Sequence, residues 1–254
     1  MQTVADIVLT DVSMRYEEGP VVLDEVSFSA PAGSFQSIVG PSGCGKSTML
    51  RLAAGLLEPF DGSVRVDGRD PCREHGRMTG FVFQEPTLMP WLTVCDNIAL
   101  LLRLRGVGRV ERRERAEELA RMLGLGDYLG YYPRQLSGGM KMRVSVARAL
   151  SVSPKVMLFD EPFAGLDAIS RDRFGEELLD IWHGAGWTAL FVTHNIPEAI
   201  FLSQKVHVMG GRPGRIAYSI DVPFEYPRAA ALRNSQEFQK IVAEVSCALK
   251  EVSA

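Results

Sequence analysis

The fold is decided by the stretch Gly40-Pro41-Ser42-Gly43-Cys44-Gly45-Lys46-Ser47-Thr48. Its first and last glycines are separated by four residues and are followed by Lys and Ser, which is the spacing of a phosphate-binding loop. The apolar run 35–39 before the loop predicts a buried strand, and 49–54 after it predicts a helix. In such a strand-loop-helix unit, backbone N–H groups, the helix N-terminus and the Lys46 ammonium face the phosphates, and Ser47 offers its hydroxyl to Mg²⁺.

The loop by itself does not identify the class of protein, because kinases, GTPases and transport ATPases all contain it. An ordinary Gly-rich turn also produces this pattern by chance, although the flanking strand and helix favour nucleotide binding. The remainder of the chain has to decide between these classes.

Composition narrows the choice. The chain has 254 residues, of which 46% are hydrophobic and 23% charged, typical of a globular protein with one large α/β domain or a main domain with a smaller lobe. A net charge of −3 argues against a nucleic-acid-binding surface. No apolar run reaches the roughly 20 residues of a membrane-spanning helix, and residues 1–11 lack a secretion signal, so we expect a cytoplasmic location. The four cysteines have no C-x-x-C spacing and are predicted to be free thiols.

The segments before the loop predict a β-rich opening. Residues 7–12 alternate in polarity, and 21–28 form a second strand-like segment. Tyr16 lies between them. Its ring could stack on a purine base, or it could be a half-buried strand tyrosine.

Between 87 and 154 helical patterns dominate. The charged segment 111–123 predicts a solvated helix with Ala116, Leu119, Met122 and Leu123 on one side, supported by the four-residue ion pairs Glu111–Arg115 and Glu117–Arg121. This region is predicted to be a helical lobe inserted into an α/β domain. A further apolar stripe predicts a C-terminal helix over 235–250, with Asn234 at its start.

Within this region, Leu136-Ser137-Gly138-Gly139 precedes a helix expected over 141–150. Ser137 is suited to cap that helix, and the glycines expose backbone N–H groups that could bind an anion. The alternative is an ordinary N-cap with a flexible lead-in.

Two further strands are predicted to end in polar residues. The apolar run 155–159 is followed by Asp160 and Glu161, and 188–193 is followed by His194. Ligands bind at the carboxyl ends of strands in open α/β sheets. One acid near Mg²⁺ and another near the attacking water would suit phosphoryl transfer, although a lone His at a strand end is more often structural.

Together, these pieces resemble the ATP-binding cassette (ABC) ATPases over almost the whole chain, and Leu136-Ser137-Gly138-Gly139 is the most specific part. The resemblance implies a P-loop NTPase core of α/β class with a mainly parallel sheet, an N-terminal antiparallel β part and an inserted helical lobe. The expected division is 1–86 and 155–254 for the core and 87–154 for the lobe.

The resemblance also implies a role for each motif. The residues from Gly40 to Thr48 would hold the phosphates of ATP. Two chains would sandwich two ATP molecules, each chain completing the other's site with Ser137, Gly138 and Gly139. The remaining assignments are Tyr16 stacking on adenine, Gln84 sensing the γ-phosphate and Mg²⁺, Asp160 supporting the metal through water, Glu161 polarising the attacking water, His194 contacting the γ-phosphate and Asp167 at the dimer seam.

Within this family, 88–94, 198–203 and 212–216 resemble the ATPases of nitrate, sulfonate and taurine importers. That resemblance implies a homodimer on the cytoplasmic face of the inner membrane, an integral membrane permease gripped through 87–91, and indirectly a solute-binding protein. Trp91 in this segment could instead belong to the core. A soluble or non-import cassette, acting in lipoprotein export, cell division or cluster assembly, is the alternative.

The sequence departs from the common family pattern at Met142 in place of Gln, at Asn195 in place of Asp, and in the order Ala164-Gly165. None of these changes removes a group expected to contact phosphate, metal or water. These departures affect the assignment of the transported substrate more than the assignment of ATP hydrolysis.

Overall fold

The chain forms two β-sheets in a computed structural model that describes residues 5–74 and 78–253. The ends of the expected core, 1–4 and 254, and the short segment 75–77 lie outside these ranges. The smaller sheet is antiparallel, with the strand order β2 (Val21–Ala30), β1 (Ile7–Arg15), β4 (Asp61–Val66). It corresponds to the predicted N-terminal antiparallel part.

The larger sheet has the strand order β5 (Thr79–Val82), β6 (Val156–Asp160), β7 (Thr188–Val192), β3 (Phe35–Val39), β8 (Lys205–Gly210), β9 (Arg215–Asp221). All neighbours are parallel except β8 and β9. The prediction of a mainly parallel sheet is confirmed, and the strand over 35–39 has the predicted bounds.

The central strands are apolar on both sides because each side of the larger sheet is covered. Phe35, Phe159 and Phe191 belong to one buried cluster, whereas their neighbours Leu158 and Leu190 belong to another. The alternation follows from the two-residue period of a strand. This double burial explains why these strands read as continuous apolar runs.

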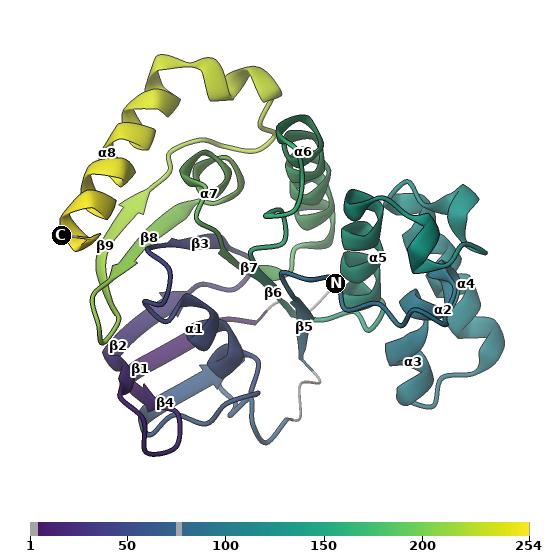
Figure 1. The fold of residues 1–254 in the computed structure, drawn as a ribbon, viewed down its shortest axis with the longest axis horizontal. Helices are drawn as coiled ribbons and strands as arrows, with labels where there is room; N and C mark the ends of the chain where they lie inside the picture. The colour runs from purple at the N-terminus through teal and green to yellow at the C-terminus, as the bar shows by residue number, and fades with distance from the viewer. Residues whose placement is uncertain (1–4, 75–77, 254) are drawn as a thin grey trace.

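The helices supply the two covering layers (Figure 1). α1 (Lys46–Ala53) and the smaller sheet cover one face, and α6 (Ala168–Ala185), α7 (Ile196–Leu202) and α8 (Gln236–Ser253) pack over the other. α8 has the predicted position, but Ser235, not Asn234, accepts a hydrogen bond from the N–H of Phe238 at its start.

A group of helices between β5 and β6 projects to one side of the sheets (Figure 1). It contains α2 (Val94–Ile98), α3 (Leu100–Leu104), α4 (Arg109–Met122) and α5 (Gly138–Leu150), with the short 3₁₀ helices η1 (Gly126–Tyr128) and η2 (Pro133–Gln135) between the last two. A third, η3 (Ala230–Asn234), precedes α8. Across the described residues, no helix is both long and apolar enough to cross a membrane.

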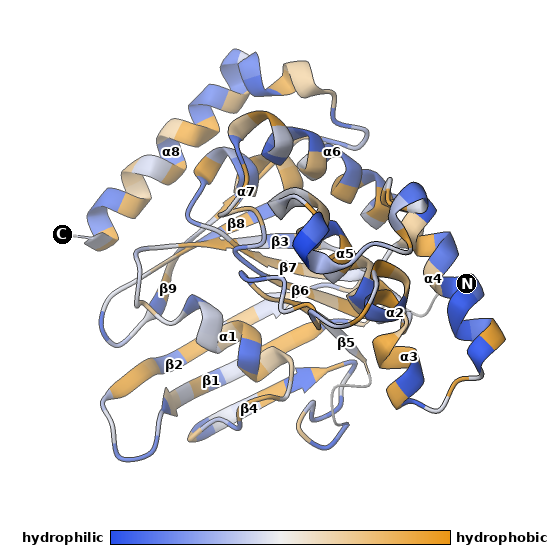
Figure 2. Cartoon of the chain, turned by 45° about the vertical axis from the view of Figure 1, so that its right-hand side comes forward, coloured by the Kyte–Doolittle hydropathy of each residue, from blue (hydrophilic) through white to orange (hydrophobic). Residues whose placement is uncertain are grey.

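The surface of α4 differs in detail from the prediction. Ala116, Leu119 and Leu123 are buried, but Met122 is exposed. The ion pairs of this helix are Arg113–Glu117 and Arg115–Glu118, so the predicted pairs are wrong. Hydrophilic residues dominate α4 (Figure 2), as expected for a solvated helix.

Candidate active site

The phosphate loop connects the end of β3 to the start of α1. Gly43 and Gly45 have φ values of 83° and 98°, in the left-handed region that favours glycine. A Cβ atom on Gly45 would also lie 2.5 Å from Cδ2 of Leu23. These two positions therefore require glycine for the loop to curl in front of α1.

The side chain of Lys46 folds back onto the phosphate loop. Its Nζ atom donates hydrogen bonds to the carbonyl oxygens of Gly40 and Pro41, each at 2.9 Å, and the residue is buried. Cys44 is also buried, and burial raises the pKa of its thiol. The ammonium of Lys46 is therefore a charge held at the loop, and Cys44 is a neutral packing residue.

The chain brings Ser47 and Asp160 together from distant positions in the sequence. Ser47 Oγ donates a hydrogen bond of 2.8 Å to Oδ1 of Asp160, the last residue of β6. Burial raises the pKa of Asp160, and the hydrogen bond from Ser47 opposes this effect. A hydroxyl and a carboxylate oxygen at the phosphate loop are ligands of the kind that Mg²⁺ uses together with substrate phosphates.

No cluster of three or more His, Cys, Asp or Glu side chains that could hold a metal occurs in the described part of the chain. Ser47 and Asp160 supply oxygen ligands of the kind that Mg²⁺ combines with phosphate and water oxygens.

Glu161 and His194 lie at the ends of neighbouring strands. His194 Nδ1 is 2.8 Å from Oε2 of Glu161, and the backbone N–H of Glu161 donates to the carbonyl of Val192 at 2.9 Å. The imidazole is exposed, whereas the carboxylate is largely shielded. The pair of side chains thus lies at the carboxyl edge of the parallel sheet, next to Asp160.

Tyr16 follows β1 and reaches the start of α1. Its hydroxyl is 3.1 Å from Oγ1 of Thr48, and 40% of the residue is exposed. The ring is anchored at one end beside the phosphate loop and remains available to a ligand.

The residues 137–139 begin α5, three residues earlier than predicted. Ser137 Oγ accepts a hydrogen bond from the N–H of Met140 at 3.3 Å, so the predicted cap is present. Within the described chain, these residues have no hydrogen bond to the phosphate loop. A Cβ atom on Gly139 would instead lie 3.5 Å from Cδ2 of Leu166.

Two other predicted site residues make no hydrogen bond to Ser47 or Asp160 within the described part of the chain. Gln84 is exposed in the segment after β5. Asp167 is the N-cap of α6: its side chain accepts from the N–H of Ser170 at 3.0 Å, and this hydrogen bonding holds the Asp167 pKa below its usual range. The capping role of Asp167 was not predicted.

Sequence reasoning also missed the contacts of two arginines, Arg148 and Arg212. Arg148, in the last turn of α5, donates to the carbonyls of Pro86 and Thr87, each at 2.9 Å, and so joins the end of α5 to the segment that follows Gln84. Arg212 lies against the phosphate loop, because a Cβ atom on Gly43 would be 3.3 Å from its Nη2 atom. The stretch 212–216 was singled out in the sequence, but without a role.

Comparison with known proteins identifies the family to which this arrangement of motifs belongs. The sequence matches the ABC transporter family over residues 23–164. The chain is 42% identical to the taurine import ATP-binding protein of Rhizobium johnstonii, covering 92% of this chain and 91% of that protein. It is 42% identical to an aliphatic sulfonates import ATP-binding protein of Bacillus cereus, covering 87% and 85%.

Among solved structures, a dimeric ATP-binding cassette in a post-hydrolysis state with ADP and Pi superposes with a TM-score of 0.77 at 31% identity. The match covers 86% of this chain and all of that chain. The predicted resemblance and fold class are confirmed, and the chain belongs to the ABC transporter family as an ATP-binding cassette ATPase.

Proposed function

We propose that this chain is the ATP-hydrolysing subunit of an importer that takes up a small anion or related organic solute of the nitrate, sulfonate or taurine type. The observation that carries the proposal is the meeting of Ser47 with Asp160, and of Glu161 with His194, at one edge of the sheet. The names of the taurine and sulfonate import relatives support import over lipoprotein export, cell division or cluster assembly.

Hydrolysis would use the residues at this edge in separate roles. The loop 40–48 and Lys46 bind the phosphates of ATP, with the Tyr16 ring against the adenine. Ser47 and Gln84 would hold Mg²⁺, with Asp160 supporting it through water, and the bound ion would supply positive charge that neutralises the phosphates. Glu161 orients the attacking water, and His194 donates a hydrogen bond to the γ-phosphate. Phosphoryl transfer needs mainly this positioning and charge stabilisation.

A second copy of the chain would complete each site. Ser137 and Gly138 are exposed at the start of α5, and Asp167 is exposed at the start of α6. An exposed helix N-terminus is suited to bind the γ-phosphate of ATP held by the other copy. We therefore assign Ser137, Gly138 and Gly139 to the partner's site and Asp167 to the seam between the copies.

The permease would bind where the core, residues 1–86 and 155–254, meets the lobe, residues 87–154. A groove of about 490 Å³ lies between the two parts, and its apolar wall includes Phe83 and Leu104, both exposed. Trp91 lies in the segment 87–91 and is 70% exposed, which excludes the core alternative for its side chain. A permease helix in this groove would place the cassette peripherally on the cytoplasmic face of the inner membrane, with a solute-binding protein on the other side.

Co-purification tests this proposal. The tagged chain should be recovered from detergent-solubilised membranes together with an integral membrane permease, and Trp91→Ala should lower that recovery without changing ATP hydrolysis by the isolated chain. Val110→Ala, at another exposed apolar residue of the lobe, is the matched control. Recovery in a stable complex with nucleic acid or ribosomes, and without a permease, would oppose the importer assignment.

A further inference from the structure

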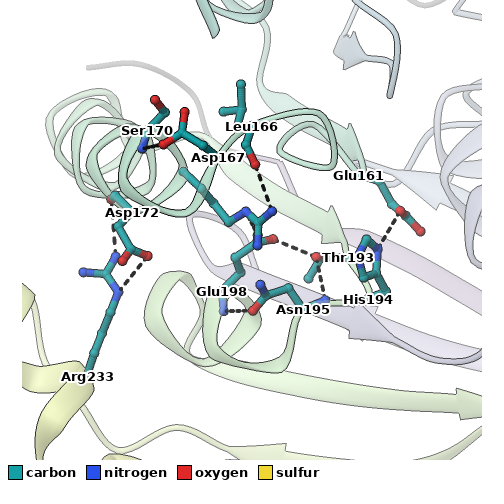
Figure 3. A network of polar contacts seen from close by, with 11 residues as sticks. Glu161, Leu166, Asp167, Ser170, Asp172, Thr193, His194, Asn195, Glu198 and Arg233 are labelled. Carbon is teal, nitrogen blue, oxygen red and sulfur yellow. Dashed lines mark hydrogen bonds and ion pairs between the residues drawn. The ribbon is translucent and has the colours of Figure 1, made fainter. Parts of the chain in front are cut away.

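A polar network lies behind His194, on the side away from Glu161 (Figure 3). We propose that Arg171 and Glu198 form a positioning pair that holds the His194 loop in place and links it to the segment 165–167. The inference rests on the proposed catalytic roles of Glu161 and His194. It adds two residues that touch neither of them.

Glu198, at the start of α7, fixes the loop that carries His194. Its Oε2 atom accepts a hydrogen bond from Thr193 Oγ1 at 2.7 Å, and Thr193 Oγ1 accepts one from the N–H of Asn195 at 3.0 Å. The N–H of Glu198 in turn donates to Asn195 Oδ1 at 3.1 Å. Both neighbours of His194 are therefore held by the same residue.

Arg171, in the first turn of α6, connects Glu198 to a second loop. Its Nε atom is 3.1 Å from Oε1 of Glu198, and Nη2 donates to the carbonyl of Leu166 at 3.0 Å. Leu166 directly precedes Asp167, which we assign to the dimer seam. One guanidinium therefore joins this segment to the carboxylate that holds the His194 loop.

The pair is shielded from water. The Glu198 side chain is 10% exposed and the Arg171 side chain 25%. Burial raises the pKa of Glu198, while the hydrogen bond from Thr193 and the charge of Arg171 lower it. The attraction between the two charges is stronger in such shielded surroundings than it would be between solvent-exposed side chains.

The network gives a physical route from the seam to the catalytic edge. Gly139 lies near the Leu166 side chain, Leu166 is held by Arg171, and Glu198 holds the loop of His194. A shift of 165–167 when two copies close on ATP would therefore move the imidazole.

Arg171→Leu and Glu198→Gln are the primary variants. We expect kcat for ATP hydrolysis to fall about 10- to 100-fold, the effect of misplacing a reacting group by about 1 Å, with KM within about threefold of the parent chain. The double variant should lose no more than the larger single effect, because the two residues act as a unit. Arg171→Lys, which keeps the charge, should recover part of the activity.

Arg173→Leu is the matched control. Arg173 lies on the same helix and pairs with Glu177 at 3.3 Å, but its side chain is 78% exposed. It should leave kcat unchanged. A folded Arg171→Leu chain with the kcat of the Arg173→Leu chain would overturn the proposal, and so would additive losses in the double variant.

Hydrogen exchange distinguishes failure of this inference from failure of the proposed function. In Arg171→Leu, exchange should accelerate at the amides of Asn195 and Glu198, and in Arg173→Leu it should not. Unchanged exchange there would refute the link even if hydrolysis falls. If exchange accelerates but Glu161→Gln and His194→Ala keep full hydrolysis, the link stands as a structural connection, while the proposed active site and the catalytic role of the pair are both wrong.

Discussion

His194 Nδ1 lies 2.8 Å from Oε2 of Glu161, across the ends of two neighbouring parallel strands. Glu161 adopts a φ of 47°, a conformation that few residues other than glycine occupy and that costs about 1–3 kcal/mol. The hydrogen bonds around it hold it there. A carboxylate that is hydrogen-bonded to an imidazole and carried on a strained backbone beside the phosphate loop is suited to positioning a water molecule.

Glu161→Gln tests that role directly. The amide has the size of the carboxylate but lacks its charge, so we expect kcat for ATP hydrolysis to fall about 10²-fold or more while the Kd for ATP stays within about threefold. Phosphate release and equilibrium nucleotide binding measure the two quantities. Glu237→Gln, at an exposed position in the first turn of α8, is the control. Turnover near that of the parent chain would reject the assignment.

Lys46→Ala should affect binding itself. The ammonium donates hydrogen bonds to two carbonyl oxygens of the phosphate loop. Phosphate oxygens of bound ATP would accept hydrogen bonds from the same ammonium. Charge-assisted hydrogen bonds contribute about 1.5–3 kcal/mol, so the Kd for ATP should rise about tenfold or more. Lys155 pairs with Asp67 and not with the phosphate loop, so Lys155→Ala should leave the Kd for ATP unchanged. Equal affinities in the two variants would count against phosphate binding by Lys46.

The parts of the fold that the sequence predicted are those fixed by local pattern. The buried strand over 35–39 and the apolar runs ending at Asp160 and His194 were predicted because both faces of a parallel sheet are covered. The phosphate loop was predicted from the spacing of its glycines before Lys46 and Ser47, and two of them, Gly43 and Gly45, occupy left-handed positions that favour glycine. The family resemblance added the order of these pieces.

Other contacts depend on tertiary structure and leave no periodic signal. On α4, Arg113 and not Arg121 pairs with Glu117, although both lie four residues from it. Arg148 reaches the carbonyl of Thr87, and Arg171 reaches Glu198, only because separate segments fold together. Asp167 was assigned to a seam and not to a cap, because a capping residue and a site residue look alike in a sequence.

Mixing two inactive variants should restore activity if two chains share each site. Ser137→Arg places a bulky cation at the exposed start of α5, and Glu161→Gln removes the carboxylate. A dimer with one chain of each kind carries both lesions in one site and leaves the other site intact. ATP hydrolysis by the mixture should therefore exceed that of either variant alone. A mixture as inactive as its components would contradict the shared site.

His207 should make folding stability depend on pH. His207 lies in β8 and is 5% exposed, its ring is hydrogen-bonded to Gln36 Oε1 at 2.7 Å and Ser219 Oγ at 2.8 Å, and burial lowers its pKa from 6.5 to about 4. The imidazole binds a proton more readily in the unfolded chain than in the folded one. The free energy of unfolding is therefore highest above pH 6.5, and it falls by about 3 kcal/mol as the pH decreases toward 4. Urea unfolding at pH 7 and 4.5 should show a smaller pH-dependent loss for His207→Gln than for the parent chain, whereas exposed His183→Gln should retain the full loss. Equal losses in all three would show that His207 is not the group responsible.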